Sequence, residues 1–169
     1  GSLLAWKLFY YSYALILPLN MVPLSWWIII LGFLCMHAIT GLLVSIVFQI
    51  AHIMPAVDFP LPDQTGNMKN EWYRHQLSTT SNFAPNSKLL FWAIGGLNYQ
   101  VEHHVLPDVC HVHYKDLSKI VQETAREFGM PYHVKKSIFK AIIDHTKMLR
   151  MLGRNPVQYA NNKSAAYSA

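Results

Sequence analysis

Residues 8–57 read LFYYSYALILPLNMVPLSWWIIILGFLCMHAITGLLVSIVFQIAHIMPAV, and these 50 residues contain no Asp, Glu, Lys or Arg. A bilayer core about 30 Å thick is crossed by about 20 helical residues. The stretch is therefore long enough for two passes, and Pro18 and Pro23 bracket a short turn between them. We predict two transmembrane helices, at about residues 3–22 and 26–54.

The charged residues lie almost entirely in the second part of the chain. Only 14% of the 169 residues are charged, against roughly 25% in soluble domains. All nine acidic residues, and all Lys and Arg residues except Lys7, follow residue 57. We expect residues 1–57 to lie in the membrane and residues 58–153 to face water, with a positive excess that favours the cytoplasmic side and anionic lipid headgroups. The polar residues 154–169 show no periodicity and are expected to be disordered.

The water-facing region is predicted to be built from helices, because no segment shows the alternation of a strand. A short helical stretch is expected near residues 71–80. A further helix is expected to begin at a cap formed by Asn86 or Ser87, to run to His104 and to stop at Pro107.

A glycine pair, Gly95-Gly96, lies within that helix. Such a pair lowers helix stability and usually marks the close approach of another group. Two amphipathic helices follow, with apolar residues at helical spacing from Leu117 to Phe128 and from Phe139 to Leu149. The predicted class is all-α: an integral-membrane helical hairpin followed by a cytoplasmic helical cap.

Gln100, His103 and His104 are spaced i, i+3 and i+4, so a helix places them on one face. Neighbouring imidazoles can ligate a metal together, and imidazole suits iron, zinc and copper. The alternative is a pair of histidines hydrogen-bonded to headgroups or to neighbouring residues. Glu102 points away from this face, and we interpret it as a salt-bridge residue or as support for a ligand, not as a ligand.

His52 is a second candidate ligand, because an ionisable residue in a membrane helix is by default a functional hypothesis. The predicted helix 26–54 is longer than a bilayer requires, so His52 should project on the same side as Lys7 and the charged region. The alternative is a histidine that reaches to the interface. His37 lies 15 residues earlier, about 22 Å along a helix. It cannot share a metal with His52, and we interpret it as a hydrogen-bonded core histidine.

The other histidines give weaker signals. His111 and His113 could chelate a metal from an extended segment, His75 could belong to a site, and His133 and His145 are expected on the surface. No His-Glu-x-x-His, Gly-x-Ser-x-Gly or phosphate-binding glycine motif is present in the sequence, so nothing favours a hydrolase. The basic residues form no stripe with interleaved aromatics, which argues against nucleic-acid binding.

The stretch GGLNYQVEHH, residues 95–104, resembles the third histidine box of the front-end acyl-lipid desaturases, especially bacterial members. In that subfamily Gln replaces the first His of the box, and Gln100 matches. The resemblance covers nearly all of the chain to about Gly153. Other matching stretches are Phe48-Gln49 with His52, Glu71-Trp72, His75-Gln76, Thr79-Thr80, Asn82-Phe83, Leu106-Pro107 and CHVHY at 110–114.

This resemblance implies a non-haem di-iron centre on the cytoplasmic face, where O2 and two supplied electrons are used to place a cis double bond in an acyl chain. It assigns His52, His103 and His104 as iron ligands and Gln100 as a ligand or its support. Residues that could line the site are His75, Thr80, Asn82 and Asn98. The implied partners are a fatty-acyl lipid or CoA thioester, an electron donor such as ferredoxin or cytochrome b5, and membrane lipid.

Two further histidine motifs of the family, His-x-x-x-His and His-x-x-His-His, are absent from this sequence. They normally lie upstream, so we expect this C-terminal part to be inactive and to bind iron poorly by itself. One alternative is a histidine-rich membrane di-iron hydroxylase or sphingolipid desaturase. Another is a helix pair that anchors haem, which needs facing histidines on two helices. The first predicted pass has none.

Overall fold

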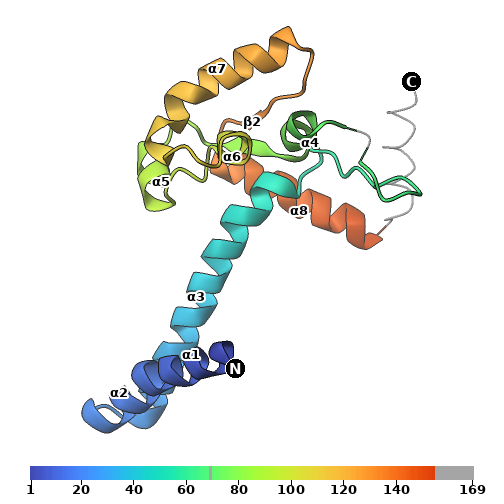
Figure 1. Ribbon diagram of the computed structural model, residues 1–169. Coiled ribbons are helices and arrows are strands. Elements are labelled where there is room, and N and C mark those ends of the chain that lie inside the picture. Colours follow the sequence, from blue (N-terminus) through green and yellow to red (C-terminus); the bar gives the residue numbers. More distant parts are fainter. Residues whose placement is uncertain (69, 155–169) are drawn as a thin grey trace. The chain divides into compact units, whose positions relative to one another are not determined.

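The computed structural model describes residues 1–68 and 70–154, and these are mainly helical (Figure 1). The chain divides into two compact units, Gly1–Ser45 and Ile46–Ala169. The high helix content and the two apolar helices near the N-terminus confirm the predicted fold class. The tail that was expected to be disordered lies outside the described residues, except for Arg154.

The N-terminal unit is built around two apolar helical arms. The first arm consists of α1 (Ser2–Tyr11), a π-helical turn (Ser12–Ile16) and α2 (Leu17–Met21). The second arm is α3 (Trp26–His52), whose last turns belong to the other unit. Both arms are long and apolar enough to cross a bilayer, and their apolar windows are 0% buried within the protein.

Pro18 lies inside the first arm and not at its end, so the predicted turn between Pro18 and Pro23 is wrong at its first boundary. Pro18 occupies the first turn of α2, where its missing N–H costs little. The π-helical turn precedes it immediately, and such turns accommodate a proline within a helix. The arms also meet at His37, whose Nε2 lies 3.1 Å from Tyr10 Oη and whose Nδ1 lies 2.9 Å from the Phe33 carbonyl. His37 is therefore hydrogen-bonded, as predicted, although it is exposed.

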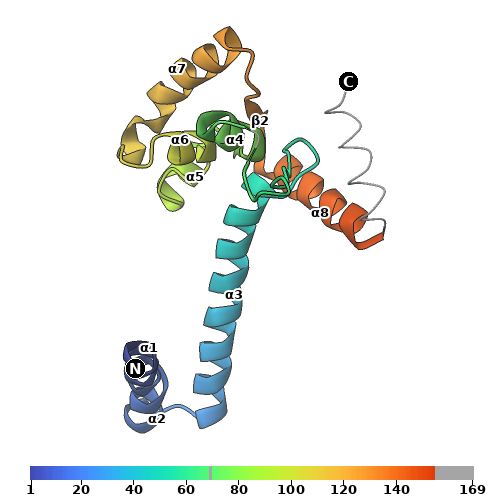
Figure 2. The same cartoon turned by 45° about the vertical axis from the view of Figure 1, so that its right-hand side comes forward.

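The second unit consists of short helices and two short strands around α6. Its elements after α3 are α4 (Trp72–Thr79), β1 (Ser81–Phe83), α5 (Lys88–Ala93), α6 (Gln100–Val105), a 3-10 turn (His111–His113), α7 (Tyr114–Glu127), β2 (His133–Lys135) and α8 (Ile138–Arg154). α6 contacts α4, α7 and β1. Figures 1 and 2 both show α6 between α7 and α8.

The two strands are a difference from the predicted helix-only region. β1 and β2 pair in parallel, with Asn82 opposite Val134 and Phe83 opposite Lys135. Each strand has three residues, and all three residues of β1 are buried. A strand this short and buried on both faces produces no alternating pattern.

The predicted helix from residue 86 to His104 is also wrong, because it is divided into α5 and α6. Gly95 and Gly96 have φ values of +60° and +75°, a left-handed conformation that ends a helix. A Cβ on Gly96 would lie 2.8 Å from His111 Cβ, so the predicted close approach is confirmed. Ser87 caps α5, since its Oγ accepts a hydrogen bond from Leu90 N–H.

Two hydrophobic clusters hold α6 and the end of α3 in place. The first joins Ile50 and Ala51 of α3 to Phe83 and Ala141, which connects α3 with β1 and α8. The second joins α4, α6 and α7 through Leu77, Val101 and Ala125. The two helices that carry the predicted ligands are therefore fixed by packing that involves most of the unit.

His145 contributes to the same packing and is not the surface residue that was expected. It is 8% exposed, and its Nδ1 lies 2.8 Å from the carbonyl oxygen of Ile53. This contact fixes α8 to the chain immediately after α3. Buried polar atoms need such a partner, and the partner is 92 residues away in sequence.

Candidate functional site

The residues of the predicted third histidine box lie on α6 and differ in their exposure. They are Gln100, His103 and His104. Gln100 is the first residue of the helix and is 1% exposed, and Val101 after it is fully buried. His103 and His104 are half-buried on the last turn of α6. His103 Nδ1 lies 3.3 Å from Tyr114 Oη at the start of α7. Burial of the first turn fixes the direction in which the two imidazoles point.

His52 and His104 meet directly, although they are 52 positions apart in the sequence. Their Nε2 atoms are 3.1 Å apart, and their rings are nearly perpendicular, at 83°. His52 Nδ1 lies 3.3 Å from the Thr79 carbonyl at the end of α4. The structure thus brings the helix-end histidine and the box histidine together with their Nε2 atoms facing each other.

The surroundings keep His104 neutral. Burial lowers the pKa of His104 to about 4, with further contributions from His52 and His103. A neutral imidazole has a free nitrogen lone pair, which is the form that ligates metals. At neutral pH, His104 can therefore act as a ligand without first losing a proton.

Several buried polar atoms near α6 have no hydrogen-bond partner among the described residues. The two polar side-chain atoms of Gln100, Nε2 and Oε1, belong to this set. The others are Thr80 Oγ1, Asn98 Oδ1 and His75 Nδ1. Gln100, Thr80 and Asn98 are at most 1% exposed. Leaving such a group unpaired costs about 1–3 kcal/mol, so these atoms indicate a partner that the chain itself does not supply, such as a metal ion or water.

The donor set fits iron, but it is only partial. Imidazole nitrogens dominate it, and imidazole is a suitable ligand for iron. Within residues 1–68 and 70–154, no group of three or more His, Cys, Asp or Glu side chains is arranged to hold a metal ion. His52 and His104 form a close pair, while the His103 ring lies 5.6 Å from the His104 ring, centre to centre.

Asn82, which was expected to line the site, uses its side-chain amide to support α6. Its Nδ2 donates to Glu102 Oε2 (2.8 Å) and to Tyr132 Oη (2.9 Å). Its Oδ1 accepts from Val101 N–H, and Tyr132 Oη donates to Glu102 Oε1 at 2.7 Å. Glu102 is fully buried, and its two bonded neighbours are an amide and a phenol, not the cation of a salt bridge.

Glu102 and Tyr132 influence each other's ionisation. Burial raises the pKa of Glu102, although the hydrogen bonds from Tyr132 and Asn82 oppose this shift. Burial and the neighbouring Glu102 carboxylate raise the pKa of Tyr132 far above its usual range. No motif or spacing in the sequence singles out Tyr132, because its partner lies 30 residues away.

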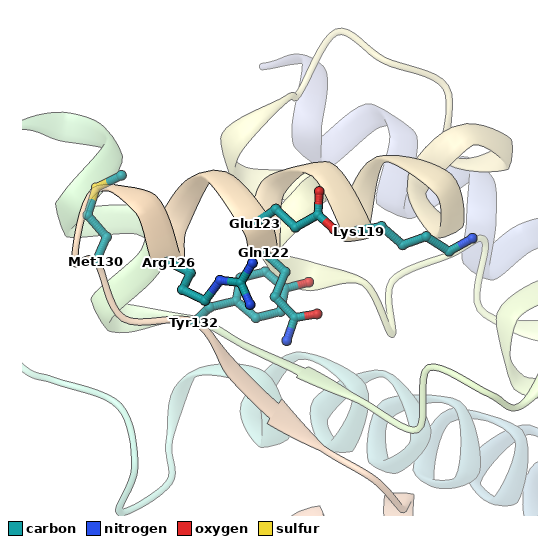
Figure 3. A pocket seen from close by; sticks show the side chains of 6 residues that line it. All are labelled: Lys119, Gln122, Glu123, Arg126, Met130 and Tyr132. Atoms are coloured by element: carbon teal, nitrogen blue, oxygen red, sulfur yellow. The ribbon is translucent and has the colours of Figure 1, made fainter.

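Two pockets lie beside these groups. One of about 340 Å³ is lined by His52, Ile53, Asp58, Phe59, Pro60, Leu61, His75 and Thr79, so His75 shares a cavity with His52. The other, about 550 Å³, is lined by Tyr132, Met130 and four α7 side chains: Lys119, Gln122, Glu123 and Arg126 (Figure 3). The first pocket borders His52 of the histidine pair, and the second borders Tyr132.

His111 and His113 do not lie on the extended segment that was expected. They are the ends of a 3-10 turn that leads into α7. His111 packs against Gly96 and lies 5.9 Å from the Phe91 ring, centre to centre. These contacts give His111 a packing role at the break between α5 and α6.

Residues 2–136 match the family described as fatty acid desaturase. The chain belongs to the fatty acid desaturase family. It is 36% identical over 158 residues to the sn-1 linoleoyl-lipid 6-desaturase of Arthrospira platensis, covering 92% of this chain and 42% of that protein. Together with the two apolar helices, the family identifies a membrane protein.

Other relatives in this family act on acyl lipids by name. The chain is 35% identical over 150 residues to the acyl-lipid (8-3)-desaturase of Mortierella alpina, covering 89% of this chain and 33% of that protein. It is 36% identical over 147 residues to the enzyme of the same name from Physcomitrium patens, covering 87% of this chain and 30% of that protein. The chain therefore spans less than half the length of these relatives. No solved structure matches it.

Proposed function

We propose that this chain is part of a di-iron acyl-lipid desaturase that introduces a cis double bond into a fatty-acyl chain. The observation that carries the proposal is the meeting of His52 and His104, with Nε2 atoms 3.1 Å apart, in a chain of the fatty acid desaturase family. The names of the relatives support an acyl-lipid substrate and favour a desaturase over a hydroxylase.

In this proposal, His52, His103 and His104 hold iron, and Gln100 either holds it or orients a ligand. When bound, the iron pair supplies O2 activation and the removal of two hydrogens from neighbouring methylene groups. The chain's own residues keep the ligands positioned, and His104 enters the site as a neutral imidazole. His75, Thr80 and Asn98 contribute polar atoms with no partner among the described residues, which suits ligands or bound water.

The site needs further ligands and partners. A partial donor set in a chain that spans less than half the length of its relatives supports additional histidines outside these 169 residues. We therefore propose that the chain by itself is inactive and binds iron poorly. In the whole protein, the site faces the cytoplasm, and a ferredoxin or cytochrome b5 supplies the two electrons.

The test is product analysis of the full-length protein that contains this chain, produced in a host that lacks the modified fatty acid. We expect a new cis double bond and its complete loss in His104→Ala and in His52→Ala. His37→Ala is the matched control, because His37 is hydrogen-bonded within the N-terminal unit, and it should retain the product. A hydroxylated product would contradict the desaturase, and activity in His104→Ala would contradict the site.

A further inference from the structure

Helix α8 has an inner face that is fixed to the end of the membrane helix α3. Ala141, His145 and Met148 are buried at positions i, i+4 and i+7. Ala141 packs against Ile50 and Ala51 of α3, and His145 contacts the chain just after α3 ends. Both views show α8 running across the last turns of α3 (Figures 1 and 2). α8 therefore lies at the depth where an apolar membrane helix ends.

The opposite side of α8 exposes apolar and basic residues in one line. We call this line the outer stripe, and its members follow at intervals of three or four residues: Phe139, Ile143, Lys147, Arg150 and Arg154. This spacing keeps them on one helix face. Phe139 is 75% exposed and Ile143 is 53% exposed, although side chains of this size usually find an apolar neighbour.

The charged side chains of α8 are mainly basic. Asp144 is its only acidic residue, and its carboxylate is 2.8 Å from Lys135 Nζ. The exposed Lys140 adds a fourth basic group beside the outer stripe. α7 also exposes the apolar Ile120, and Phe128 is exposed just after its end, but the acidic and basic side chains of α7 are mixed.

We propose that the outer stripe of α8 lies on an anionic membrane surface. Phe139 and Ile143 enter the boundary between headgroups and acyl chains, and Lys147, Arg150 and Arg154 contact lipid phosphates. A helix with an apolar side and an otherwise basic surface lies in the plane of the interface, and clustered Lys and Arg favour anionic lipids. Binding at the interface also requires the helix to lie at the correct depth. The contact of α8 with the end of α3 meets this requirement.

The test uses the whole chain, with Cys35→Ser and Cys110→Ser, in vesicles of phosphatidylcholine with or without phosphatidylglycerol. A nitroxide label on Ile143→Cys reports its surroundings through relaxation by O2, which concentrates in lipid, and by a water-soluble nickel complex. We expect O2 to dominate at residue 143, and the nickel complex to dominate at Gln122→Cys, an exposed control on α7. Relaxation mainly by nickel at residue 143 would overturn the proposal, and so would protection from both reagents, which would indicate a covering protein surface.

The basic residues are tested in the same labelled chain. Phosphatidylglycerol should move the label at residue 143 deeper, and the triple variant Lys147→Gln, Arg150→Gln, Arg154→Gln should lose this shift. The matched control removes three positive charges from α7 through Lys115→Gln, Lys119→Gln and Arg126→Gln, and it should keep the shift. Equal loss in both variants would show that only net charge matters and would overturn the assignment to α8.

Discussion

His52 and His104 constrain each other through their Nε2 atoms. At 3.1 Å, two protonated imidazoles would repel each other, so at most one of the facing nitrogens carries a proton. The lowered pKa of His104 agrees with this, because burial and the two neighbouring histidines all disfavour its charged form. A ligand position is thus prepared by the protein before any metal arrives.

Gly96 is the residue for which substitution should be most costly at the break before α6. Gly96→Ala places a side chain at φ +75° and puts its Cβ 2.8 Å from His111 Cβ. Gly95→Ala is the control, since it has φ +60° but nothing within 4 Å. The left-handed conformation costs about 1–2 kcal/mol in either case, and the clash adds to this at residue 96 only. Thermal unfolding in detergent should show a larger loss for Gly96→Ala, and equal losses would contradict the close approach.

Tyr132 should matter for stability although no sequence motif marks it. Tyr132→Phe removes one of the two hydrogen bonds to the buried Glu102 carboxylate and should cost about 1–3 kcal/mol. Tyr73→Phe is the control, because Tyr73 is 56% exposed and its hydroxyl should contribute within about 0.5 kcal/mol. Denaturant unfolding of both variants measures the difference, and a Tyr132→Phe protein as stable as Tyr73→Phe would disprove the support role.

Among the elements, β2 and α8 are joined by the ion pair of Lys135 and Asp144. Lys135 lowers the pKa of Asp144 below its ordinary value of 3.8. A carboxyl group with a lowered folded pKa stabilises the protein above pH 3.8, and this stabilisation is lost as the pH falls through the folded pKa. Both side chains are mostly sheltered, at 19% and 16% exposed.

Asp144→Asn should therefore cost up to about 1 kcal/mol near neutral pH, and this difference from the parent protein should vanish below the folded pKa. Asp116→Asn is the control, because Asp116 is 86% exposed and lies 3.8 Å from Lys119. It should change stability little at any pH. The measurement is the unfolding midpoint as a function of pH, and a cost for Asp144→Asn that persists in acid would contradict the ion-pair explanation.

The elements that sequence predicts well here are those fixed by local composition. The charge-free stretch predicts two long helices, and the local sequence narrows the cap of α5 to Asn86 or Ser87, of which Ser87 is the one used. The break at Gly95 and Gly96 was not predictable from periodicity, because the apolar pattern continues through it. The pairing of β1 with β2 depends on contacts between segments about 50 residues apart, which short-range patterns do not record.

For the whole molecule, the sequence predicts the residues of the site but not the residues that support them. The i, i+3, i+4 spacing predicts which residues α6 carries, and helix length predicts that His52 lies near the end of α3. Neither argument predicts that Asn82 and Tyr132 support Glu102 or that His145 fixes α8. These are long-range contacts whose partners carry no sequence signature of their own.

In the proposed site, His52 and His104 ligate iron as part of an incomplete set of ligands. Anaerobic titration of the purified chain with Fe²⁺, with retained iron counted after desalting, tests it most directly. We expect weak binding, with less than a stoichiometric pair of irons retained. We also expect at least about a tenfold loss of affinity in His52→Ala and His104→Ala but not in His37→Ala. Two tightly retained irons per chain, or affinities unchanged by both ligand substitutions, would contradict it.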